Sequence, residues 1–129
     1  MSRLLLPILA IGIAGCTAAS SGATRPNSSL ITEAELAAIS VSNVYEAVQR
    51  LRPSWLRPPV RRSINLSTEI AVVQNGSYFG SVESLRAIAA LNVREIRYLD
   101  GPSAIAEVAG ILGGGRHIDS AILVRTGGQ

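Results

Sequence analysis

One stretch decides the fold of this 129-residue chain: VREIRYLDGPSAIAEVAGILGGG, residues 93–115. Its first seven residues alternate between apolar and polar, which predicts a half-buried strand over residues 93–99 with Ile96 and Tyr98 on the inner face. A turn follows, and then an apolar helix over residues 104–112 that the three glycines end. The region therefore predicts a strand, a turn and a helix in close succession.

Two further strands are predicted on either side of this region. Residues 70–73 are a short apolar run closed by Asn75 and Gly76, the dipeptide that best tolerates the positive φ angles of a hairpin turn. The last predicted strand covers residues 121–125. Strands separated by short helices predict an α+β fold, with a small mixed β-sheet and short helices packed on it.

Capping patterns predict the helices before and between these strands. The sequence TEAE at residues 32–35 has the form of a capping box, so a helix is expected to begin at Glu33. Ser42 is the predicted cap of a second helix, which ends before Pro53. Ser81 is the predicted cap of a third, short helix.

The N-terminus carries an apolar run, LLLPILAIGIAGC, at residues 4–16. Its length is typical of a signal peptide and is well below the roughly 20 residues that span a bilayer. Small residues precede Cys16, the only cysteine of the chain, and in this the run resembles the lipobox of bacterial lipoproteins. The resemblance implies cleavage after Gly15 and acylation of Cys16. The alternative is an ordinary cleaved signal peptide in which Cys16 is incidental.

This pattern divides the chain into three parts: a lipoprotein signal peptide at residues 1–15, the lipidated Cys16 and a flexible tether at residues 16–30, and a domain at residues 31–129. A tether of this small, polar composition reaches about 20 Å from the bilayer. Thr17 follows Cys16 where retention in the inner membrane would favour Asp. The lipoprotein resemblance therefore implies an outer-membrane location, with the domain facing the periplasm and joined to the membrane by its lipid anchor.

The domain resembles the plug domain of TonB-dependent outer-membrane receptors over about residues 42–126. The resemblance rests on the order of five local motifs, at residues 44–53, 72–76, 93–99, 101–104 and 114–126. No barrel segment follows these motifs in this sequence, so we expect a free-standing plug-like domain and not a transporter. Fold analogy alone does not give the chain the function of the receptors.

Composition and spacing argue against catalysis. All 12 basic residues are arginine, which excludes lysine chemistry, and an acylated Cys16 leaves no thiol for a nucleophile, a disulfide or a zinc site. His117, Asp119 and Ser120 have the residue types of a hydrolase triad, but neighbours on a strand point to opposite faces. We interpret His117 as an exposed turn residue. No catalytic residue, no metal, no cofactor and no enzyme activity are expected.

An arginine-rich segment is the predicted binding surface, and it comprises Arg50, Arg52, Trp55, Arg57, Arg61 and Arg62. Arginine binds phosphate and carboxylate groups bidentately, so anionic lipid headgroups or acidic glycans are suitable partners. The alternative is a solvated connector whose arginines pair with carboxylates, while Trp55 covers the core. Nucleic acid also fits the charge, but a lipid-anchored envelope protein would seldom meet it, and no nucleic-acid partner is expected.

Together these observations predict a non-enzymatic lipoprotein of the cell envelope. Its plug-like domain is expected to act as a binding or protein-interaction module at the outer membrane, with an envelope protein as a possible partner. The alternative is an accessory protein that binds an anionic envelope polymer or lipid headgroups through the arginine-rich segment.

Overall fold

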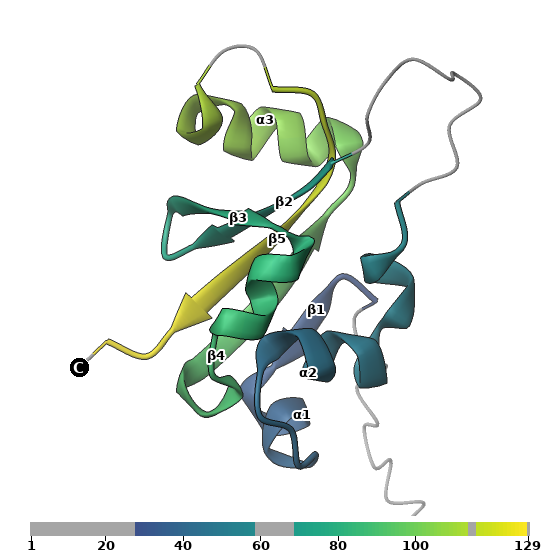
Figure 1. Cartoon of the computed structure of the whole chain (residues 1–129), viewed down its shortest axis with the longest axis vertical. Coiled ribbons are helices and arrows are strands. Elements are labelled where there is room, and N and C mark those ends of the chain that lie inside the picture. Colours follow the sequence, from purple (N-terminus) through teal and green to yellow (C-terminus); the bar gives the residue numbers. More distant parts are fainter. Residues whose placement is uncertain (1–27, 59–68, 114–115, 129) are drawn as a thin grey trace, which may run out of the picture.

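Five strands form one mixed sheet in the computed structural model, which describes residues 28–58, 69–113 and 116–128. The strand order is β1-β4-β5-β2-β3 (Figure 1). Only β2 and β5 are parallel neighbours, and the other pairs are antiparallel. The strands are β1 (Leu30–Thr32), β2 (Glu69–Gln74), β3 (Ser77–Ser81), β4 (Val93–Leu99) and β5 (Ile118–Thr126). The predicted α+β fold with a small mixed sheet is confirmed.

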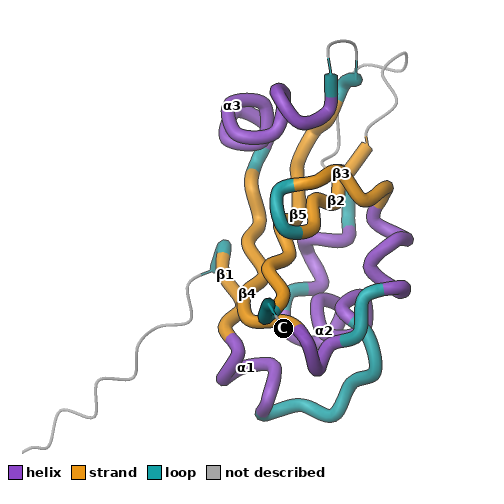
Figure 2. Tube along the Cα trace, turned by 90° about the vertical axis from the view of Figure 1, so that its left-hand side faces the viewer, coloured by secondary structure: helices purple, strands orange, loops and turns teal. Residues whose placement is uncertain are grey.

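Helices cover the two faces of the sheet unequally. The α-helices are α1 (Glu33–Ala37), α2 (Val44–Leu51) and α3 (Gly101–Leu112), and the 3-10 helices are η1 (Pro53–Leu56), η2 (Val82–Ala87) and η3 (Ala90–Asn92). Figure 2 shows α3 on one side of the sheet, with α2 and the 3-10 helices on the other. Among the described helices, none combines the length and the apolar character that crossing a membrane requires.

The larger core lies on the α2 side of the sheet, and we call it the α2 core. It contains buried residues from β1, β2, β4 and β5 together with residues of α1, α2, η1 and η2, of which the largest fully buried ones are Ile31, Leu85, Ile96 and Ile122. The smaller core, which we call the α3 core, lies on the opposite face beneath α3. Alternation along each strand sends neighbouring side chains to different cores.

Local sequence signals account for most helix ends. The capping box is present, because Glu35 N donates to Thr32 Oγ1 (3.3 Å) and Thr32 N donates to Glu35 Oε2 (2.9 Å). The predicted cap of α2 was wrong by one residue: Asn43 Oδ1, not Ser42, accepts from Glu46 N at 3.0 Å. An asparagine carbonyl is as good a cap as a serine hydroxyl, so composition alone did not separate the two positions.

Strand β1 was not predicted. Leu30, which the sequence analysis placed at the end of the tether, is its first residue, and the carbonyl of Ser29 already accepts from Tyr98 N at 2.9 Å. Leu30, Ile31 and Thr32 pair with the middle of β4. Three residues are too few to show a period-2 pattern, so only the neighbouring strand reveals this one.

The turn at Asn75 and Gly76 was predicted correctly, and both residues have positive φ angles, of 49° and 82°. Strand β3, which the turn leads into, was missed because its small and aromatic residues are half exposed. The Asn75 side chain joins the hairpin to the end of β5, since its Oδ1 accepts from Thr126 N (3.0 Å) and its Nδ2 donates to Thr126 Oγ1 (2.8 Å).

Two predicted boundaries shift, and one predicted helix is of another type. The turn at Asp100 is the cap of α3, which begins at Gly101 and not at residue 104, because Asp100 Oδ1 accepts from Ser103 N at 3.3 Å. Strand β5 begins at Ile118 and not at residue 121. The helix after Ser81 is a 3-10 helix with no side-chain cap, and it is followed by a buried Ile88 and an exposed Ala89, although Ala89 was expected to point inward.

Candidate binding surfaces

The predicted arginine-rich segment does not form one surface in the described part of the chain. Arg50 and Arg57 are exposed, and neither makes an ion pair with another described residue. Arg52 and Trp55 are engaged within the domain. Arg61 and Arg62 lie outside the described residues, as does Cys16. The structure therefore supports only Arg50 and Arg57 as free cations of this segment.

Arg52 joins three elements. Its Nη2 donates to Glu35 Oε1 (2.9 Å) in α1 and to the carbonyl of Leu30 (3.3 Å) in β1, and its Nη1 donates to the carbonyl of Leu51 (2.9 Å) at the end of α2. The two charged side chains are 15% and 27% exposed. Burial alone would raise the pKa of Glu35, but hydrogen bonds from Thr32 and Arg52 outweigh it and lower the pKa. Arg52 thus stabilises the fold.

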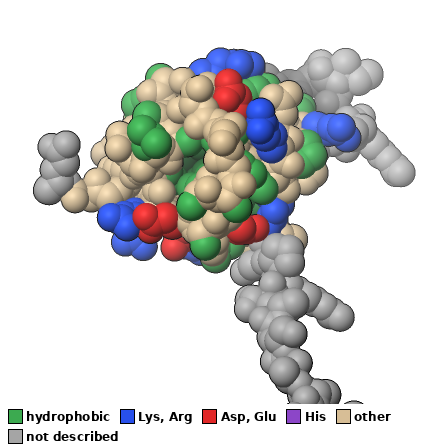
Figure 3. All heavy atoms as spheres, turned by 90° about the horizontal axis from the view of Figure 1, so that it is seen from below, with side chains coloured by type: hydrophobic (Ala, Val, Ile, Leu, Met, Phe, Trp, Pro, Cys, Tyr) green, Lys and Arg blue, Asp and Glu red, His purple; other side chains and the backbone are tan. Residues whose placement is uncertain are grey.

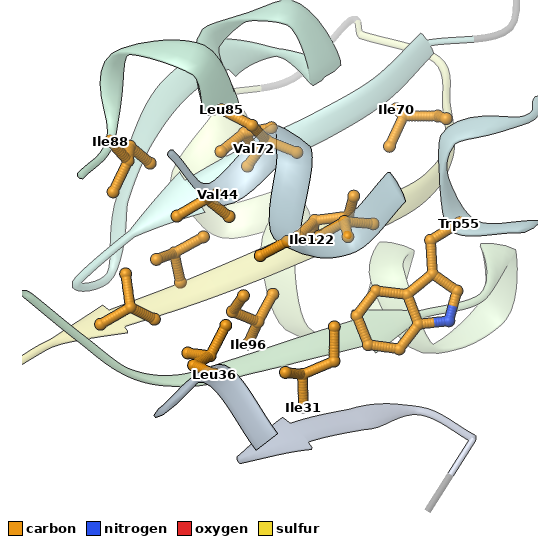
Figure 4. Packing of buried hydrophobic residues seen from close by; sticks show 14 residues of the cluster. Ile31, Leu36, Val44, Trp55, Ile70, Val72, Leu85, Ile88, Ile96 and Ile122 are labelled. Carbon is orange, nitrogen blue, oxygen red and sulfur yellow. The ribbon is translucent and has the colours of Figure 1, made fainter. Parts of the chain in front are cut away.

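Trp55 covers one end of the α2 core. Its side chain is 3% exposed, and its ring stacks on Tyr98 with centroids 5.4 Å apart and planes at 18°. The indole Nε1 donates to the carbonyl of Ser28 at 3.1 Å. Figure 4 shows the ring at the edge of the cluster, pointing toward Ile31. This placement corresponds to the structural alternative that the sequence left open for Trp55.

The residues with hydrolase-like chemistry are not brought together. His117 is exposed ahead of β5, as expected, whereas Asp119 (7% exposed) and Ser120 (fully buried) lie inside the domain. Ser120 Oγ has no hydrogen-bond partner among the described residues. Within those same residues no group of three histidine, cysteine or acidic side chains is arranged to hold a metal ion.

A polar cluster lies at the outer strand β3, and it consists of Glu69, Tyr78 and Arg116. Tyr78 OH donates to Glu69 Oε1 at 2.9 Å, and Arg116 donates to the same phenol and lies 4.7 Å from the centre of its ring. Burial and the Glu69 carboxylate raise the pKa of Tyr78, although Arg116 opposes them. The phenol therefore stays protonated near neutral pH, and the cluster holds β3 to the start of β2.

An apolar groove lies between α3 and the sheet, and we call it the α3 groove. Its volume is about 460 Å³, and its floor consists of Val73, Val108, Ile111 and Leu123. Glu107 and Arg125 stand at its rim. Arg125 makes no ion pair within the described residues, whereas Glu107 lies 3.8 Å from Arg97. The groove thus combines an apolar lining with one cation, Arg125, that has no ionic partner among the described residues.

Sequence reasoning missed the α3 groove. The alternation of β5 places Arg125 on the face opposite to the buried Val124, and this signal was available. What the sequence did not reveal is that α3 covers only part of its side of the sheet, since Arg97 and Arg125 of β4 and β5 remain exposed beyond it. Only the packing of α3 determines where the groove opens.

A smaller hollow of about 260 Å³ lies at the α1 end of the molecule, beside the 93% exposed Leu91. Figure 3 looks at this end and shows hydrophobic side chains interspersed with acidic and basic ones that lie next to each other. Arg94 and Glu33 form an ion pair at 2.8 Å. The view shows no patch of a single charge, so this end does not replace the arginine-rich segment as a basic surface.

The chain was also compared with known proteins. No protein-family model, no curated protein and no solved structure matches it. The surfaces described above are therefore interpreted from their own geometry and chemistry.

Proposed function

We propose that this protein is a lipid-anchored lipoprotein of the bacterial outer membrane and that its α+β domain is a non-enzymatic binding module facing the periplasm. The α3 groove is the observation that carries the proposal. Pockets of 300–1,000 Å³ with an apolar lining and a few polar groups are the usual form of a binding site. The groove, at about 460 Å³, has this form, with an unpaired Arg125 at its rim.

The proposed partner is a segment of an envelope protein with apolar side chains and an acidic group. Its apolar side chains would contact Ile111 and Leu123, and its carboxylate would meet Arg125, whose guanidinium binds carboxylates bidentately. The resemblance to plug domains of TonB-dependent receptors suits this role only in that it is a resemblance to a small globular domain. Fold analogy adds no further function.

Site-specific photo-crosslinking in cells tests this proposal. A benzoylphenylalanine at Ile111, in the α3 groove, is expected to capture a discrete envelope protein, and the capture should be lost when Arg125→Glu is added. The same probe at Gln49, an exposed residue of α2 on the other side of the sheet, is the matched control. Identical products at both positions, or none at Ile111, would contradict the binding role of the groove.

The lipid anchor is tested separately. Mass spectrometry of the mature chain is expected to show a triacylated N-terminal Cys16, and Cys16→Ser should release the protein from the outer-membrane fraction. An unmodified thiol would contradict the anchor without touching the groove.

A second candidate role is the binding of anionic envelope polymer or lipid headgroups. The exposure of Arg50 and Arg57, which have no ionic partner among the described residues, is the observation that favours it. Retention of the domain on anionic glycans or anionic vesicles should then fall with salt and with Arg50→Glu and Arg57→Glu together. Retention that is insensitive to both would exclude this role.

A further inference from the structure

The outward side of α3 is uncharged. We call it the α3 outer face, and it consists of Pro102, Ile105, Ala106, Ala109 and Gly110, all exposed to solvent. Ile105 is 55% exposed. The single charged residue of the helix, Glu107, does not belong to this face, because it lies at the groove, next to Arg97 of β4. A helix of twelve residues thus presents to solvent a face with no charge.

The packing of the domain itself does not explain this face. A helix whose outward side is uncharged and mostly apolar is normally covered, yet the described part of the chain covers only the Ala104 and Val108 side of α3. Gly110 lies within the helix, where glycine costs about 1 kcal/mol relative to alanine, although a Cβ at this position would meet nothing within 4 Å. The composition of the face therefore indicates contact with something outside the domain.

The start of α3 lies beside the point where the chain leads toward Cys16. Ser28 and Ser29 line a hollow of about 530 Å³ together with Asp100 and Ser103, the cap and first turn of α3. Eleven residues, 17–27, separate Ser28 from Cys16. Even fully extended they span at most about 40 Å. An anchored Cys16 would therefore keep the start of α3 within about 40 Å of the lipid surface.

We propose that the α3 outer face rests on the surface of the membrane that holds the anchor, with Ile105 among the lipid headgroups. This inference depends on the lipid anchor of the proposed function. At about 18 Å, the helix is too short to span a bilayer but long enough to lie in the interface. The contact is weak by itself, and the tether makes it effective by raising the local concentration of the domain at the membrane.

The size of the face argues for lipid over a second copy of the chain. A strip of about 18 Å by 10 Å is far smaller than the roughly 800 Å² that each partner of a stable protein complex buries. Contact with a membrane does not require so large a buried area, because the lipid anchor supplies most of the attachment. Because the α3 outer face carries no charge, no ionised side chain has to lose its water when this face enters the headgroup region.

The test places the domain on vesicles without relying on acylation. The mature chain with Cys16→Ser and an N-terminal hexahistidine tag is held on phosphatidylethanolamine–phosphatidylglycerol vesicles that contain a nickel-chelating lipid. Ala109→Cys, then the only cysteine, carries the fluorophore NBD, and Gln49→Cys on α2 is the matched control. We expect NBD emission at position 109 to rise at least twofold on tethering and to be quenched by spin-labelled lipid, with little change at position 49.

Three results bear on the proposal. Loss of most of the emission increase on adding Ile105→Ser would support the assigned face. Equal signals at positions 109 and 49, or none at 109, would overturn it. An increase without vesicles that grows with protein concentration would also overturn it, in favour of a second copy. Since the nickel lipid replaces the acyl chains, failure here is distinct from an unmodified Cys16 in the native protein.

Discussion

The two faces of the sheet are buried to different extents. On one face α1, α2 and the 3-10 helices enclose a core that includes the fully buried Ile31, Leu85, Ile96 and Ile122. On the other, α3 alone packs over the sheet, where it covers small residues such as Ala71 and Ala121, and the sheet beyond it is exposed. The first face therefore buries most of the core, while the second leaves part of the sheet exposed, which is where the proposed binding groove lies.

The two edge strands of the sheet, β1 and β3, also differ. Each has a different feature that discourages pairing with a further strand. Strand β1 is only three residues long, and Arg52 donates to the carbonyl of its Leu30. Strand β3 has no charged residue, but its register with β2 shifts between Val72 and Val73, which leaves Phe79 as an extra residue. Short length and a bulge are both devices that discourage edge pairing.

The largest expected effect comes from two residues of β4 that face opposite cores. Ile96→Ala should lower the free energy of unfolding by about 4–5 kcal/mol, and Leu99→Ala by about 2–3 kcal/mol, within the range seen for such deletions. Ile96 is fully buried in the larger α2 core, whereas Leu99 is 6% exposed and belongs to the smaller α3 core, where we expect the surroundings to relax more. Urea unfolding of both variants measures the difference, and equal losses would remove the distinction between the cores.

The next effect concerns the junction that closes the α2 core. Arg52→Met should cost about 1.5–3 kcal/mol at pH 7, since it removes charge-assisted hydrogen bonds to Glu35 and to two carbonyls. The folded pKa of Glu35 is lowered, so its stabilisation is present above the unfolded pKa, near 4.5, and is lost as the pH falls through the folded pKa. Stability measured from pH 7 to pH 3 should fall less steeply in the variant. An unchanged slope would show that Arg52 does not set this pKa.

A smaller effect is expected at the hairpin that borders the α3 groove. Gly76→Ala should cost about 1–2 kcal/mol, because an alanine at a φ of 82° is strained although no atom lies within 4 Å of the added Cβ. Thermal unfolding should show a lower midpoint with an unchanged circular dichroism spectrum at 20 °C. A neutral result would mean that the turn relaxes to another geometry without disturbing β2 and β3.

The smallest effect is expected on the α3 outer face. Ile105→Ser should change the free energy of unfolding by no more than about 0.5 kcal/mol, as is usual for surface positions. The matched variant Val108→Ser, one turn further along the helix and fully buried, should be strongly destabilised. If Ile105→Ser were equally damaging, the face would belong to the core of the domain and not to its surface.

Most secondary structure followed from local signals. The alternation of residues 93–99, the capping box before α1, the proline that follows α2 and the Asn75–Gly76 turn each predicted an element or boundary that the structure contains. Strands β1 and β3 were not predicted. Strand β1 is too short to show a pattern, and β3 is half exposed. The sequence left two alternatives open for Arg52 and Trp55, and only their partners Glu35 and Tyr98 show that both are engaged within the domain.

The sequence by itself determined the α+β class, the single cysteine at position 16, the arginine-only basic residues and the periodicity that assigns side chains to one face or the other of a strand. Tertiary structure decided which arginines are free, where Trp55 lies and how much of the sheet α3 leaves exposed. The reason is that periodicity is a property of neighbours along the chain, whereas burial and ion pairing depend on residues that are distant in sequence and meet only when the sheet forms.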